Sequence, residues 1–135
     1  MATRLSIDWG EDVHFIDNVL NPFPLIQQAD VLLICSHSEA FGRVTVEAMQ
    51  IGIPVIGAAS GGTLELVKPH YNGLLYESTV EDLAEKMGYL IENQDEKNKM
   101  GENARSWSEE MFSQDKYMSK IAEVLGKIEK NTTGI

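Results

Sequence analysis

Short apolar runs alternate with helix-patterned segments through the middle of this 135-residue chain. The run 31–35 leads into a helical pattern at 42–51, and the run 53–56 leads into a second one at 63–67. A third apolar run follows at 74–76. This alternation predicts βαβ units, and the nearly continuous apolar run 31–35 predicts a strand buried on both faces. The expected fold is therefore α/β, with a Rossmann-like parallel sheet between two layers of helices.

The first thirty residues predict only short elements. Residues 5–12 have the pattern of a helix end closed by Gly10, and 13–16 (VHFI) favour a short strand. Pro22 and Pro24 then interrupt the chain before a short helix at 25–29.

From residue 78 onward the pattern is helical. Residues 78–81 (STVE) have the spacing of a capping box, with Ser78 as the N-cap residue. A second helix is expected from Asp95, and a third after Ser113, with residues 131–135 as a frayed tail. The apolar stripes of the last two helices are formed by Met100, Ala104, Trp107 and Met111, and by Tyr117, Ile121, Val124, Leu125 and Ile128. The chain is expected to be one domain, 1–135, with a helical C-terminal segment.

Composition narrows the classes of function. The net charge of −10 disfavours binding to nucleic acid or to anionic membranes. No apolar run reaches the length of a membrane span and no secretory leader is visible, so a cytoplasmic protein is expected. The single cysteine, Cys35, lies in an apolar run and is interpreted as a small buried side chain.

Two carboxylates bracket the turn that follows the run 31–35. The helix at 42–51 is predicted to face the sheet with Val44, Ala48 and Ile51. Glu47 lies at the edge of that stripe, where it either forms an ion pair with Arg43 or accepts hydrogen bonds from hydroxyl groups of a ligand. Glu39 precedes the helix and, judged by position alone, is a solvated loop residue.

The turn also has the features of an anion site. Gly42 is followed by free backbone N–H groups at the start of a helix, and such a terminus favours phosphate. A second glycine corner, 60–63 (SGGT), follows the next strand. Neither a P-loop lysine nor a G-x-G-x-x-G pattern is present, which disfavours an ATPase or a dinucleotide-binding dehydrogenase. The three histidines have no metal-ligand spacing, so no metal is expected.

Several motifs in order resemble the retaining glycosyltransferases of the GT-B fold, family 4 or group 1. The segment SHSEAFGRVTVEAM (36–49) is similar to the E-x7-E block of that family. Further blocks at 52–56, 61–67, 72–75 and 100–105 occur in the family's order, so the resemblance covers roughly residues 10 to 118.

The resemblance implies a role for each residue of the corner. Glu39 would contact hydroxyl groups of the donor sugar at the catalytic position, and Glu47 the ribose of the nucleotide. Gly61 and Gly62 would let a loop approach the donor. The backbone that would face the diphosphate and sugar belongs to Phe41, Gly42, Arg43, Val44 and Thr45. Such enzymes transfer a hexosyl group from a nucleotide diphosphate sugar, with no cofactor and no metal.

The resemblance also implies missing parts. Family members have an N-terminal acceptor-binding domain, and a strand and loop with cationic side chains that hold the diphosphate. The chain is therefore interpreted as a truncated C-terminal donor-binding domain, inactive alone, of an enzyme of cell-surface polysaccharide or glycolipid synthesis that is peripheral to the membrane. Two other interpretations stay open: a nucleotide-sugar epimerase of the same fold, and a non-catalytic association module.

Overall fold

Three parallel strands form the centre of the molecule. A computed structural model describes residues 11–132 and contains strands β1 (Leu32–Ile34), β2 (Val55–Ala58) and β3 (Gly73–Tyr76) in the order β1-β2-β3. The register pairs Leu33 with Ile56, and Ile56 with Leu74. The α/β fold with a parallel sheet is thus confirmed.

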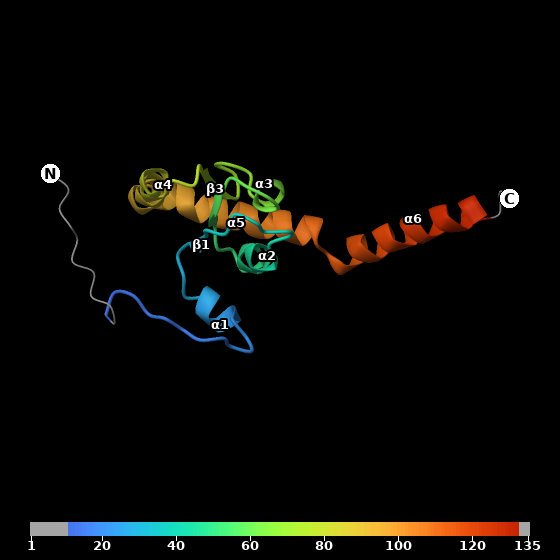
Figure 1. Cartoon of the computed structure of the whole chain (residues 1–135), viewed down its shortest axis with the longest axis horizontal. Coiled ribbons are helices and arrows are strands. Elements are labelled where there is room, and N and C mark those ends of the chain that lie inside the picture. The colour runs from blue at the N-terminus through green and yellow to red at the C-terminus, as the bar shows by residue number, and fades with distance from the viewer. Residues whose placement is uncertain (1–10, 133–135) are drawn as a thin grey trace.

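Six helices surround or extend this sheet (Figure 1). Their bounds are α1 Phe23–Ile26, α2 Arg43–Gln50, α3 Thr63–Leu66, α4 Val80–Glu92, α5 Gln94–Met111 and α6 Gln114–Thr132. Helices α2 and α3 form the two crossovers between parallel strands, as the alternation of the sequence predicts.

Each face of the sheet packs against a separate group of apolar side chains. Val55 of β2 belongs to the cluster that also contains Met49 of α2 and Leu66 of α3. The next residue, Ile56, belongs to the cluster that contains Leu90 of α4. Side chains of consecutive strand residues point to opposite faces, so β2 separates the two clusters. Helix α5 contributes to both, through Trp107 and Ala104 on one side and Met100 on the other.

The last helix extends from the end of the body. Ser113 accepts a hydrogen bond from the amide of Lys116 at 3.3 Å, so the helix start expected around Ser113 is confirmed. Figure 1 shows α6 continuing beyond the end of α5, away from the sheet. It runs through Thr132, two residues into the stretch expected to be frayed, and residues 133–135 lie outside the described part.

The short strand expected at 13–16 does not form. Residues 13–19 have no regular secondary structure, and the side chains of Phe15 and Ile16 are exposed. A strand-like pattern produces a strand only where a sheet edge accepts its backbone hydrogen bonds, and this segment does not join the described sheet. The helix end expected at 5–12 lies mostly outside the described residues.

Burial of 31–35 on both faces was also a wrong expectation. In the described sheet β1 is an edge strand, and the side chain of Leu33 is 37% exposed to solvent. Apolar sequence alone cannot distinguish an edge strand from a central one, because the distinction depends on what lies beside it.

Candidate functional site

The turn after β1 places the N-terminus of α2 at the carboxyl end of the sheet. Gly42 is the N-cap residue and has left-handed backbone angles (φ 74°, ψ 55°) that a side chain would strain. No side chain of the described residues caps this terminus. The first N–H groups of any helix lack intrahelical acceptors, so those of α2 are available to an anion.

A buried hydroxyl lies inside this terminus. Thr45 is 1% exposed, and its Oγ1 has no hydrogen-bond partner among the described residues. The hydroxyl groups of Ser60 and Thr63, in the next glycine corner, are also buried and have no hydrogen-bond partner among the described residues. Buried hydroxyls without partners are uncommon in folded proteins, and their concentration at two neighbouring corners indicates a functional site.

The two corners are in direct contact. The amide of Gly62 donates to the carbonyl oxygen of Glu39 at 2.7 Å. A Cβ atom at Gly61 would lie 2.8 Å from that same oxygen, and one at Gly62 would lie 2.8 Å from the carbonyl oxygen of Ala40. Gly61 also has a positive φ of 52°. These glycines therefore allow the loop after β2 to lie directly against the backbone of Glu39 and Ala40.

Glu39 is half-buried and held by a neighbouring side chain. The hydroxyl of Ser36 donates to its Oε1 at 2.7 Å. Sequence position suggested that Glu39 is a solvated loop residue. In the structure its carboxylate is half-buried and accepts a hydrogen bond. Ser36 was not singled out by the sequence, although a serine three residues before a glutamate in a tight turn is the available signal.

Glu47 forms an ion pair with Arg43, which is one of the two roles that the sequence predicts for it. Its Oε1 lies 3.3 Å from Nε of Arg43, and the side chains of Glu47 and Arg43 are 19% and 85% exposed. The pair is open to solvent on the arginine side, and exposed i,i+4 pairs contribute only ~0.3–0.5 kcal/mol. Arg43 can therefore turn to an anionic ligand at little cost, and the ligand-binding interpretation of Glu47 stays a prediction.

The face of α2 toward the sheet differs from the one expected. Val44 is 42% exposed, whereas Thr45 and Met49 are buried. Helix α2 packs against α5 as well as against the sheet, so its buried face is broad and is rotated away from Val44. The buried residues of α2 are Thr45, Val46, Ala48 and Met49.

Phe41 is anchored by aromatic contacts at the end of α5. Its ring centroid lies 5.7 Å from that of Phe112 in an edge-to-face arrangement, and Phe112 lies 5.6 Å from Trp107 in the same manner. Such pairs add about 0.5–1.5 kcal/mol to the burial of the rings. The aromatic contacts thus fix the backbone just before Gly42.

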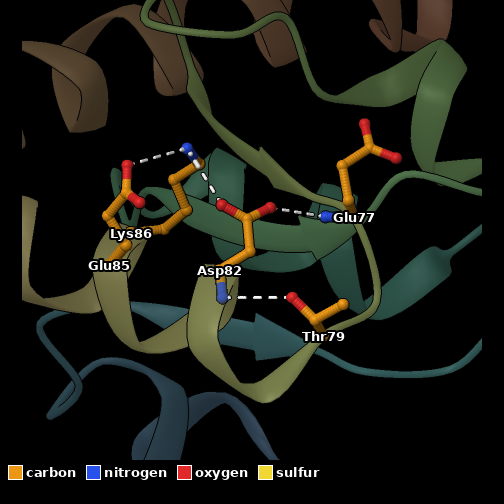
Figure 2. A network of polar contacts seen from close by, with 5 residues as sticks. All are labelled: Glu77, Thr79, Asp82, Glu85 and Lys86. Atoms are coloured by element: carbon orange, nitrogen blue, oxygen red, sulfur yellow. Dashed lines mark hydrogen bonds and ion pairs between the residues drawn. The ribbon is translucent and has the colours of Figure 1, made fainter.

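The loop between β3 and α4 also lies at the carboxyl end of the sheet. Thr79 is the N-cap residue of α4 and accepts from the amide of Asp82 at 3.2 Å, while Asp82 accepts from the amide of Glu77 at 2.7 Å (Figure 2). The cap is one residue later than expected: Thr79 has the extended backbone typical of a side-chain N-cap, whereas Ser78 has a φ of 63°. The hydroxyl of Ser78 instead lies 3.4 Å from Nδ1 of His37.

The same network shifts two ionisation equilibria. The hydrogen bond from the Glu77 amide, helped by Lys86 at 3.2 Å, lowers the pKa of Asp82. The hydrogen bond with Asp82 raises the pKa of Lys86. Figure 2 shows Asp82 joined to the Glu77 amide on one side and to Lys86 on the other. Because the carboxyl pKa is lowered and the ammonium pKa is raised, both charges are retained at neutral pH.

Cys35 is exposed, contrary to the expectation of a buried side chain. It follows the last residue of β1 at the carboxyl edge of the sheet, where the strand no longer covers it. Its thiol forms a hydrogen bond with Tyr76, and this bond, together with burial of the ring, raises the pKa of Tyr76. Tyr76 is the last residue of β3, in the strand that the apolar run 74–76 predicts, and its ring is buried.

Residues 11–132 contain no group of three or more histidine, cysteine, aspartate or glutamate side chains placed to hold a metal ion. In the same range no helix is both long and apolar enough to cross a bilayer.

Comparison with known proteins identifies the family. The family described as glycosyl transferases group 1 matches residues 5–107, which is most of the chain. The chain belongs to the group 1 glycosyltransferases. Its sheet and helices correspond to a Rossmann-like half of a GT-B fold, as in sucrose-phosphate synthase of Thermosynechococcus elongatus, which is 25% identical and superposes with a TM-score of 0.81 over 90% of this chain.

Two further relatives are more similar in sequence. An uncharacterized glycosyltransferase of Methanocaldococcus jannaschii is 38% identical over 73% of this chain. The Anabaena protein HepE, solved in complex with UDP-glucose, is 34% identical with a TM-score of 0.72 over 79% of this chain. The chain spans 28% of the first relative and 30% of the second. This group 1 glycosyltransferase chain therefore corresponds to less than a third of those proteins.

Proposed function

We propose that this chain is the donor-binding half of a retaining glycosyltransferase that transfers a hexosyl group from a nucleotide diphosphate sugar. The observation that carries the proposal is the uncapped N-terminus of α2, which lies at the carboxyl end of β1 between Glu39 and Glu47. Ligands of open α/β sheets bind at this edge, and helix N-termini favour phosphate. The UDP-glucose complex of HepE supports a nucleotide-sugar donor.

Each part of the corner has a chemical task in this proposal. The free N–H groups of α2 and the guanidinium of Arg43 face the diphosphate and stabilise the charge that develops on it as it leaves. This electrostatic contribution makes a metal ion unnecessary. Glu47 accepts hydrogen bonds from the ribose hydroxyls with the carboxylate oxygen that Arg43 does not engage.

Glu39 is assigned to the donor sugar. Ser36 holds one of its carboxylate oxygens at 2.7 Å, and the Gly62 amide holds its backbone, so the side chain is positioned before the donor arrives. A preorganised carboxylate binds sugar hydroxyls without first losing conformational freedom. The unpartnered hydroxyl of Thr45 is a further donor close to the phosphates.

The proposal includes a second domain outside this chain. The corner is an open edge of the sheet, and the relatives are about three times longer. Transfer requires a cleft that excludes water and presents the acceptor. We therefore propose that the 135-residue chain alone binds donor but does not catalyse transfer.

The test is sugar transfer by the complete polypeptide encoded with its upstream sequence. Incubation with UDP-, GDP- and ADP-hexoses, followed by NMR of the product, is expected to show transfer with the donor's anomeric configuration retained. Glu39→Gln is expected to lower the rate at least about a hundredfold, while Glu96→Gln, an exposed control on α5, leaves it within about twofold. Interconversion of the nucleotide sugar without transfer would identify an epimerase instead.

A further inference from the structure

The segment that contains Glu39 has no regular secondary structure. It connects β1, which ends at Ile34, to α2, which begins at Arg43, and residues 35–42 belong to neither a helix nor a strand. The hydrogen bonds of a helix or a sheet therefore do not fix its shape, and contacts with the neighbouring loops take their place. The amide of Gly62 supplies one such contact on the side of β2. The position of Glu39 also depends on what holds the segment on the side of β3.

Two side chains of this segment contact residues at the end of β3. Cys35 forms a hydrogen bond with Tyr76, the last residue of β3. Two residues later in each chain segment, Nδ1 of His37 lies 3.4 Å from the hydroxyl oxygen of Ser78. Strand β2 lies between β1 and β3, and it contributes Ala58 opposite Tyr76, a residue with a single methyl group. The segment after β1 thus passes over the end of β2 and is held by the loop after β3.

Ser78 is held from both sides by the first turn of α4. The amide of Glu77 donates to Oδ2 of Asp82 at 2.7 Å, and Oγ1 of Thr79 accepts from the amide of Asp82 at 3.2 Å (Figure 2). Between these two contacts, Ser78 has a φ of 63°, a left-handed backbone angle that is unfavourable for a residue with a side chain. Such residues persist where surrounding contacts fix them, and they concentrate at functional sites. Ser78 therefore presents its hydroxyl group from a fixed position.

His37 lies between the two residues whose side chains are joined at the donor site. The hydroxyl of Ser36 donates to Oε1 of Glu39 at 2.7 Å, so this hydrogen bond spans His37. The backbone of His37 sets the separation of the hydroxyl group and the carboxylate. A contact that holds the imidazole consequently also restrains the Ser36–Glu39 pair. His37 and Ser78 are both exposed, so neither side chain contributes to the core.

We propose that His37 is a positioning residue of the donor site, held by Ser78 so that Glu39 keeps the orientation in which it contacts the donor sugar. The inference rests on the proposed function and extends the site to the loop between β3 and α4. The imidazole acts through the backbone of residues 36–39 and does not touch the donor. The contact is exposed and 3.4 Å long, and one hydrogen bond of this kind changes an equilibrium by a factor of about two to five.

Backbone NMR relaxation of the 135-residue chain is the first measurement, and it does not require sugar transfer. Ser78→Ala removes the hydroxyl group, so the heteronuclear NOE of the amides of residues 36–39 should fall as the segment becomes more mobile. His37→Ala should have the same effect, and the double variant should add nothing further, because both changes remove one contact. Ser38→Ala is the control, at an exposed serine of the same segment, and it should leave these values unchanged.

The kinetics of the complete polypeptide then test the effect on Glu39. His37→Ala and Ser78→Ala should each lower kcat about two- to fivefold, with the KM for the donor within about twofold. This split is expected because α2 still binds the diphosphate, whereas the alignment of Glu39 matters most in the transition state. His37→Asn should restore most of kcat, since its amide places a polar atom where Nδ1 lies and nothing where Nε2 lies. Circular dichroism confirms that each variant is folded.

Three results separate the possible outcomes. Amides of residues 36–39 that stay rigid in Ser78→Ala would overturn the inference. It would also be overturned by a His37→Asn variant as slow as His37→Ala together with a fully active Ser78→Ala, because the imidazole would then act directly on a ligand. If the unchanged polypeptide transfers no sugar, the proposed function fails, whereas increased mobility of residues 36–39 in Ser78→Ala still supports the positioning of this segment.

Discussion

The amide of Gly62 donates a hydrogen bond to the carbonyl oxygen of Glu39 at 2.7 Å, which joins the loops that follow two neighbouring strands. Each loop begins at the carboxyl end of its strand and leads into a helix. The contact makes the two corners one rigid edge, and it places the half-buried carboxylate of Glu39 beside the free N-terminus of α2. The position of Glu39 therefore depends on residues some twenty positions later in the chain.

The close approach at Gly62 predicts a loss of stability when a side chain is added. A Cβ atom there would lie 2.8 Å from the carbonyl oxygen of Ala40 and 3.0 Å from that of Glu39, and both are backbone atoms that cannot turn away. Gly62→Ala is expected to lower the free energy of unfolding by about 1–3 kcal/mol in urea titrations. Gly88→Ala is the matched control, because nothing lies within 4 Å of a Cβ atom at that helical position. It should raise stability by ~0.5–1 kcal/mol, and equal losses in both variants would count against the packing.

The lowered pKa of Asp82 predicts that the free energy of unfolding decreases at acidic pH. Its pKa is lowered in the folded state, first by the Glu77 amide and then by Lys86, so ionised Asp82 stabilises the fold above its unfolded pKa. That contribution is lost as the pH falls through the folded pKa, below about pH 4. Asp82→Asn keeps an acceptor for the amide but removes the charge. The urea midpoint of the variant should fall less steeply than that of the unchanged chain between neutral pH and pH ~3, and parallel curves would exclude the linkage.

The unpartnered hydroxyl of Thr45 predicts opposite effects on stability and binding. Thr45→Val removes no hydrogen bond from the free chain, so the free energy of unfolding should stay the same or rise by up to about 1 kcal/mol. Affinity for UDP should fall if the hydroxyl donates to the phosphates. Thr45→Ser should do the reverse, because it keeps the hydroxyl and loses a buried methyl group. A Thr45→Val variant that is strongly destabilised would show that the hydroxyl is bonded in the free protein.

The hydrogen bond from Ser36 to Glu39 predicts a change in the catalytic rate of the complete enzyme. The hydroxyl lies 2.7 Å from Oε1 at a solvent-exposed position, where a hydrogen bond contributes about 0.5–1.5 kcal/mol. Ser36→Ala is expected to lower kcat/KM about two- to tenfold with little effect on UDP affinity. Ser36→Thr, which keeps the hydroxyl, is the control. A loss confined to UDP affinity would assign Ser36 to the nucleotide instead.

The order of elements could be predicted because it depends on local patterns. The helix with buried Met100, Ala104 and Trp107 is confirmed, as are the two crossovers and the start of α6 at Ser113. Each is specified by apolar periodicity or by a capping side chain close in sequence.

Two of the failures depend on neighbours distant in sequence. The rest of the sheet decides whether β1 is a central or an edge strand, and whether 13–16 finds a partner strand. The displaced cap of α4 is a local failure: Ser78 has a φ of 63°, and Thr79 caps the helix instead. At the site, the contact of Gly62 with Glu39 joins two turns that no local pattern relates.

Titration of the chain with nucleotides tests the donor site most directly. Backbone amide NMR spectra recorded with UDP, GDP and ADP should show shifts confined to residues 39–47 and 60–65, which form the joined corners. Loss of these shifts in Gly62→Ala, with the fold retained, would assign them to the joined corners themselves. Spectra that do not change at millimolar nucleotide, or that change only at residues outside the two corners, would contradict the assignment of a nucleotide-sugar site.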